Sequence, residues 1–92
     1  MIKSFKHKGL ARFFMENDKS LLNAKHCERI SRLLDRLDSS VEISDMNLPG
    51  YGLHKLLGDR KDIWSVKVSG NWRITFRFEG THAYDVYLED YH

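Results

Sequence analysis

The chain has 92 residues, of which 41% are hydrophobic and 30% are charged, and its formal net charge is +2. This length and balance are typical of one folded domain over residues 1–92 and exclude a disordered chain. The single cysteine excludes an internal disulfide and a multi-cysteine zinc site. No stretch approaches the roughly 18 consecutive apolar residues of a membrane span, and the N-terminus lacks the apolar segment of a signal peptide. We therefore expect a cytoplasmic protein.

Charge is unevenly distributed along the chain. Lysine and arginine concentrate in residues 1–12 and 55–77, whereas acidic residues concentrate in 35–45 and 85–90. If the two basic segments meet in space, they form a surface suited to phosphate groups. The alternative is that these charges are scattered over the surface and solvated.

The first half of the chain predicts a short strand followed by two helices. Residues 2–5 alternate between apolar and polar types, which favours a strand, and residues 9–15 form an amphipathic pattern typical of a short helix. A longer helix follows Asn23, which is a suitable N-cap. Its apolar residues recur at spacings of three, four and three, which places Cys27, Ile30, Leu34 and Leu37 on one stripe. Leu33 lies beside this stripe. Cys27 is therefore interpreted as a core side chain and not as a nucleophile.

The second half of the chain has the two-residue period of a sheet. A connection over residues 39–50 ends in the turn signal Pro49-Gly50. Strands are predicted over four segments, the last with Tyr84, Val86 and Leu88 on one side: residues 51–57, 64–68, 72–78 and 82–88. Gly70 supplies the positive backbone angle of the tight turn between the second and third.

The predicted sheet has two chemically different faces. One face is apolar and must be covered, and the helices of the first half are the available cover. The other face carries Lys67, Arg73 and Arg77. The predicted fold class is therefore α+β, with two N-terminal helices packed on one face of a mainly antiparallel sheet.

A cluster of reactive side chains ends the chain. Asp90, Tyr91 and His92 directly follow the last predicted strand. Because consecutive strand residues point to opposite faces, the three act together only after a bend beyond Leu88 or at the edge of the sheet. Arg73 is a good clamp for a phosphate, since its guanidinium is always charged and offers a bidentate fork. The alternative for Arg73 is an ion pair with a cross-strand carboxylate.

These groups fit RNA cleavage better than metal or nucleophilic chemistry. The histidines and Asp90 include possible metal ligands, but no ligand spacing supports a preformed site, and no serine or cysteine lies in an activating context. Attack of a 2′-hydroxyl on its own phosphate needs a base, an acid and nearby positive charge. Histidine, aspartate and arginine meet that need, so we expect no metal and no cofactor. His54 alone is open to a structural or a catalytic interpretation.

Several motifs, in their order and spacing, resemble the HigB toxins of the RelE superfamily. They are Leu53-His54, Gly58-Asp59-Arg60, Trp64-Ser65-Val66, Asn71-Trp72-Arg73-Ile74-Thr75-Phe76 and Glu89-Asp90-Tyr91-His92. The opening Met1-Ile2-Lys3-Ser4-Phe5 and the total length match as well, so the resemblance covers the whole chain. It implies a RelE-like fold and a single toxin domain.

The resemblance also implies a function, partners and a site. Such toxins of type II toxin–antitoxin systems are ribosome-dependent mRNA endonucleases. They act in the 30S A site, where 16S rRNA helps to hold them. A HigA-like helix-turn-helix antitoxin neutralises them. Carried over to this chain, the family's catalytic residues are His54, Arg73, Asp90, Tyr91 and His92. His92 or Asp90 would transfer protons, Arg73 would steady the phosphate, and Tyr91 would orient or stack on a base. Four cations of the second basic segment are the expected RNA contacts: Lys55, Arg60, Lys67 and Arg77.

One position departs from the family's pattern. The family often has a lysine directly before the Gly-Asp-Arg motif, where this chain has Leu57. Lys55 is the candidate substitute, two residues earlier on the predicted strand. An alternative function follows from the same position: a non-catalytic RNA- or ribosome-binding module that inhibits translation under the control of its antitoxin. A third possibility is a regulatory protein that acts mainly through its antitoxin complex.

Overall fold

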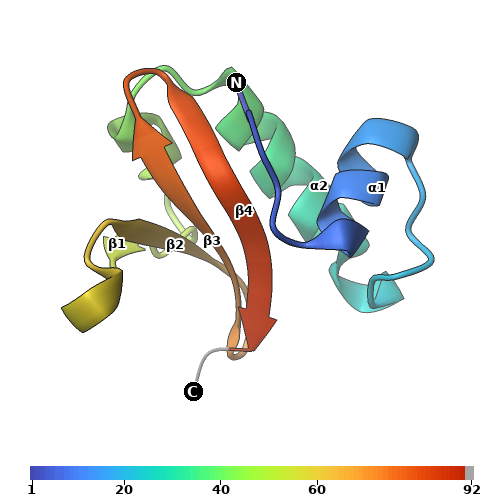
Figure 1. The fold of residues 1–92 in the computed structure, drawn as a ribbon. Coiled ribbons are helices and arrows are strands. Elements are labelled where there is room, and N and C mark those ends of the chain that lie inside the picture. The colour runs from blue at the N-terminus through green and yellow to red at the C-terminus, as the bar shows by residue number, and fades with distance from the viewer. Residues whose placement is uncertain (91–92) are drawn as a thin grey trace.

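Two helices cover one side of a four-stranded antiparallel sheet in the computed structural model, which describes residues 1–90 (Figure 1). The sheet order is β1-β2-β3-β4, so each strand pairs with its neighbour in sequence. The fold is therefore α+β, as predicted. Its elements are α1 (Lys8–Glu16), α2 (Ala24–Ser39), the 3-10 turn η1 (Ile43–Met46), β1 (His54–Lys55), the 3-10 turn η2 (Gly58–Arg60), β2 (Ile63–Ser69), β3 (Trp72–Glu79) and β4 (His82–Asp90).

Both helices begin at a side-chain cap. The Asn23 side chain accepts a hydrogen bond from the backbone N–H of Lys25 (2.9 Å), which confirms the predicted N-cap of α2. His7 does the same for α1, where its Nδ1 accepts from the backbone N–H of Leu10 at 3.2 Å. The cap on α1 requires an unprotonated Nδ1, because only that form accepts a hydrogen bond.

The core lies between α2 and the covered face of the sheet. The predicted apolar stripe of α2 is buried along its whole length, including Cys27. It packs against Val66, Ile74, Phe76 and Val86 of the three long strands, which are almost inaccessible to solvent. No described helix is long and apolar enough to cross a membrane.

Two predicted strands differ in the structure: one is replaced by isolated bridges, and the other is only two residues long. Residues 2–5 form no strand but two isolated parallel bridges to β4, at Ile2 and Phe5, so this segment lies along the edge of the sheet (Figure 1). Residues 51–57 contribute only the two residues of β1. Gly52, with φ of 58°, and the turn that begins at Gly58 bracket this strand and limit its pairing.

A β-bulge at Asp85 interrupts the alternation that was predicted for β4. Thr75 pairs with Tyr87 but Arg77 pairs with Tyr84, so Phe76 opposes two residues of β4. Asp85 adopts φ of 57°, and its backbone N–H donates to Ser4 Oγ at 2.8 Å. The core side of β4 is therefore formed by Ala83, Val86 and Leu88, and the prediction that Tyr84 shares it is wrong.

Candidate active site

The face of the sheet opposite the helices has small polar residues at its centre and long charged side chains around them. We call this surface the open face, and the cross-strand pairs define it as His54, Ser65, Lys67, Arg73, Thr75, Tyr87 and Glu89. Ser65 and Thr75 are buried although they lie outside the apolar core. We call these two small, buried side chains the floor of the open face, because longer side chains surround them on the neighbouring positions of the sheet.

His54 lies on the open face beside Ser65. Its Nδ1 lies 3.1 Å from the carbonyl oxygen of Gly52, and its Nε2 lies 3.4 Å from Ser65 Oγ. Because a carbonyl oxygen only accepts, the Nδ1 contact places the proton of the neutral ring on that nitrogen. Nε2 is then the unprotonated nitrogen and can accept a hydrogen bond, either from Ser65 Oγ or from a bound group.

Arg73 lies on the open face near the start of β3, between two charged neighbours. It pairs across the sheet with Lys67 on β2 and with Glu89 on β4. Glu89 also binds Arg60 from η2: Nη1 lies 3.2 Å from Oε2, and Nη2 contacts Oε1. This ion pair carries a second guanidinium from the β1–β2 connection across the sheet, so positive charge gathers around Arg73.

A cleft of about 490 Å³ opens beside this group of charges. It runs along β4 over Thr75 and is lined by Lys6, Asp59, Arg60, Ile63, Thr75, Asp85, Tyr87 and Glu89. Sequence reasoning did not identify Lys6, Tyr87 or Glu89 as part of the site. Alternation with Val86 and Leu88 was the available signal for both Tyr87 and Glu89, because both lie on the other side of β4 from these core residues.

Two predicted RNA contacts lie away from Arg73. Lys55 pairs with Trp64 and its ammonium lies 5.3 Å from the centre of that ring, on the opposite side of β1 from His54. Arg77 lies four residues along β3, where it forms ion pairs with Glu79 and with Asp85 (3.4 Å). The hydrogen bond that Arg77 donates to the Glu79 carboxylate raises the pKa of Arg77 above its ordinary value, with Asp85 adding to the effect. The roles of Lys55 and Arg77 toward RNA stay predictions.

The last described residue, Asp90, lies at the end of the edge strand β4. No bend follows Leu88, because β4 continues to Asp90, which pairs with Trp72. Asp90 therefore lies on the other face from Glu89 and Arg73, but at an exposed end of the edge strand. Tyr91 and His92 lie outside the described residues, so their predicted catalytic roles stay predictions.

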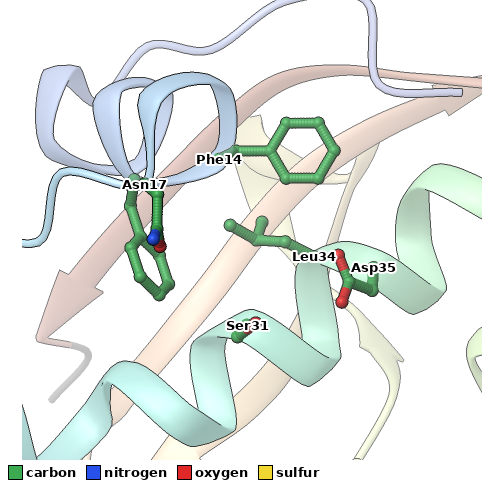
Figure 2. A pocket seen from close by; sticks show the side chains of 6 residues that line it. Phe14, Asn17, Ser31, Leu34 and Asp35 are labelled. Atoms are coloured by element: carbon green, nitrogen blue, oxygen red, sulfur yellow. The ribbon is translucent and has the colours of Figure 1, made fainter.

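A second cavity of about 210 Å³ lies between the helices, far from the open face in the fold. Phe14 and Asn17 at the end of α1 face Ser31, Leu34 and Asp35 of α2 across it (Figure 2). Its lining contains no arginine or lysine, unlike the cleft over Thr75. Within residues 1–90 no group of three or more His, Cys, Asp or Glu side chains is arranged to hold a metal ion.

The fold and the open face together define a small α+β protein with a cationic, histidine-bearing surface suited to phosphate groups. Over residues 3–92 the chain matches the family described as the RelE-like toxin of type II toxin-antitoxin system HigB. It is also 47% identical over 92 residues to a protein named Endoribonuclease HigB from Proteus vulgaris, and the match covers 100% of both chains. The chain belongs to the HigB family of RelE-like toxins, which confirms the resemblance found in its motifs.

Proposed function

We propose that this toxin is an endoribonuclease that cuts translated mRNA in the ribosomal A site. The observation that carries the proposal is the placement of His54 Nε2 and the Arg73 side chain on the same face of the sheet, around the floor formed by Ser65 and Thr75. A proton acceptor and a guanidinium on one rigid surface are two of the groups that phosphate chemistry at a 2′-hydroxyl needs. The Proteus vulgaris relative is named as an endoribonuclease.

The proposed reaction needs no metal. A base removes the 2′-hydroxyl proton while the oxygen forms a bond to the adjacent phosphorus, and the bond from phosphorus to the 5′ oxygen breaks. An acid protonates that leaving oxygen, which gives a 2′,3′-cyclic phosphate and a 5′-hydroxyl end. We assign proton transfer to His54, Asp90 and His92, stabilisation of the charged phosphate to Arg73, and base orientation to Tyr91.

Cations around Arg73 are the proposed contacts to the RNA backbone. Lys67 is directly opposite Arg73, and Arg60 is held nearby by Glu89. Arg60 is better placed than Lys55 to replace the lysine that the family often has at position 57, because Lys55 lies over Trp64 on the other side of β1. Lys55 and Arg77 are assigned to more distant phosphates.

The proposed partners follow from the family. As a toxin of a toxin–antitoxin system, the chain has an antitoxin partner, and we propose that it is of the HigA-like helix-turn-helix class. Action on a translated message places the protein on the 30S subunit, against 16S rRNA, and therefore in the cytoplasm.

Primer extension on a translated message tests the proposal. Wild-type protein is added to a purified translation system with and without ribosomes, and the variants are His54→Ala, His92→Ala and Arg32→Ala. Arg32 is an exposed arginine of α2 that pairs with Glu28, so it serves as the control. We expect discrete cuts only with ribosomes, fewer cuts with either histidine variant, and unchanged cutting with Arg32→Ala. Absence of cuts with wild-type protein contradicts the proposal.

Leu57 favours a second candidate, a translation inhibitor that binds RNA or the ribosome without cleavage. Its side chain is 89% exposed at the rim of the sheet, where the family often has a lysine. Inhibited translation with no cuts in the same assay supports this binding module. Leu57→Lys separates the two further, since restored cutting in that variant assigns the defect to the missing cation.

A further inference from the structure

The cleft beside Arg73 has the features of a site for one unpaired nucleotide. We propose that it binds the base of a nucleotide that flanks the phosphate held at Arg73, with the base stacked on Tyr87. The proposal rests on the proposed function, because it concerns how the same RNA is held. The volume of the cleft, about 490 Å³, falls within the usual range of small-molecule sites.

Tyr87 presents an aromatic ring to the cleft and is held in place from behind. Its side chain is 40% exposed and lines the cleft, so part of the ring is open to a bound group. The His7 ring packs against it edge-on, with ring centres 5.5 Å apart and planes at 63°. A fixed and exposed ring is a stacking platform that accepts any base, because every base has an aromatic face.

The position of Tyr87 matches the neighbouring phosphate site. Glu89 pairs with Arg73, and Tyr87, two residues earlier on the same face of β4, pairs with Thr75. Two residues of a strand span about 7 Å, a distance that the sugar and base of one nucleotide bridge. Ile63 adds apolar surface on the other side of the Thr75 floor.

The charges of the cleft are compatible with an RNA chain. Two of its three carboxylates already have cationic partners: Glu89 binds Arg60, and Asp85 binds Arg77. The third, Asp59, is exposed to solvent. Lys6 and Arg60 are on the cleft lining, where they attract the phosphates that flank a stacked base.

Steady-state cleavage by Tyr87 variants tests the site. Tyr87→Ala, Tyr87→Phe and Tyr84→Ala are compared with wild type on a translated message. Tyr84 is the control, because it lies on the same strand but packs over Arg77 instead of lining the cleft. We expect Tyr87→Ala to raise KM about tenfold with kcat unchanged, because stacking is lost equally in ground and transition states. Tyr87→Phe keeps the ring and should remain within about twofold of wild type.

A binding measurement distinguishes stacking from a structural role. A short RNA with 2′-O-methyl groups and one 2-aminopurine is titrated into each folded protein, on and off the 30S subunit. We expect fluorescence quenching at one probe position with wild type and Tyr87→Phe, and none with Tyr87→Ala. If Tyr87→Ala fails to fold, wild type and Tyr87→Phe still test the site, because the proposal requires quenching at one probe position in both.

Three outcomes overturn the proposal while leaving the proposed function intact. They are an unchanged KM in Tyr87→Ala, an equal loss in Tyr87→Phe, or weaker antitoxin binding with normal cleavage, which assigns the cleft to the antitoxin. No cleavage by wild type together with no quenching overturns both. Quenching without cleavage supports the site in a protein that binds RNA only.

Discussion

The two faces of the sheet use the same strands for different purposes. On the helix side, β2, β3 and β4 contribute Val66, Ile74, Phe76 and Val86, which are buried among the side chains of α1 and α2. On the open face, the same strands contribute Lys67, Arg73 and Glu89, which keep their charges at or near the surface. Alternation along each strand therefore places a residue for stability beside a residue for function.

This difference implies that stability and activity are separable by single substitutions. Apolar burial stabilises the fold in proportion to the area removed from water, whereas charged groups on the open face add little to it. Variants of one face should therefore leave the property of the other face unchanged.

The largest effect is expected at the centre of the core. Phe76 is 0% exposed, so Phe76→Ala should lower the free energy of unfolding by about 3–5 kcal/mol, a large part of the stability of a small domain. Urea denaturation followed by circular dichroism measures the change. Phe76→Leu is the milder control, and a loss below about 1 kcal/mol for Phe76→Ala would show that the core is not where we place it.

Arg73 gives the corresponding prediction for the open face. Arg73→Ala should reduce the cleavage rate about 10²- to 10³-fold, because it removes a charged donor to the phosphate. The same variant should unfold within about 1 kcal/mol of wild type. Arg32→Ala on the exposed side of α2 is the matched control for loss of one arginine. Equal loss of activity in both variants contradicts a specific role for Arg73.

A smaller effect is expected at the helix layer, far from the open face. Asn23→Ala removes the side-chain acceptor for Lys25 N–H and should cost about 1 kcal/mol of stability, with cleavage unchanged at temperatures where the protein is folded. Asn23→Asp retains the acceptor and should retain most of the stability. A change in kcat without a change in unfolding would be inconsistent with the separation of the two layers.

The smallest effect concerns His7, which lies at the boundary between the layers. Partial burial lowers the pKa of His7 below its ordinary value, because desolvation disfavours the charged ring. The unfolded chain therefore takes up this proton first as the pH falls. The contribution of His7 to stability is complete above pH about 6.5 and is lost as the pH falls through the lowered pKa.

Chemical denaturation at several pH values measures this dependence. Wild type should lose stability between neutral and mildly acidic pH, since protonation also removes the cap acceptor at Leu10 N–H. His7→Asn keeps an acceptor side chain that does not titrate in this range, so its stability curve should be flatter. The same slope in both proteins would assign the dependence to other groups.

Local sequence patterns predicted those features whose causes are local. The stripe of α2 and its Asn23 cap depend on residues a few positions apart, and both are confirmed. The parity of Arg73 on β3 was predicted from its apolar neighbours for the same reason.

Features that depend on distant contacts were not predictable in this way. The bulge at Asp85 is held by Ser4, which is 81 residues away, and by Arg77, so the alternation of Tyr84, Val86 and Leu88 gave no sign of it. Arg60 was expected to contact RNA, but its fixation by Glu89 depends on the packing of η2 against β4. The cleft combines side chains from the N-terminal segment, η2 and three strands, and no single segment of the sequence carries its pattern.

The direct test of the central claim is a map of where RNA binds. Arginine side-chain Nε–H signals are followed by NMR while a 2′-O-methyl RNA is added to the protein. We predict shifts of Arg73 on the open face and of Arg60, which Glu89 binds beside it, and constant signals from Arg29, Arg32 and Arg36 of α2. Shifts confined to the arginines of α2, with Arg73 unchanged, would contradict the claim that the open face is the RNA site.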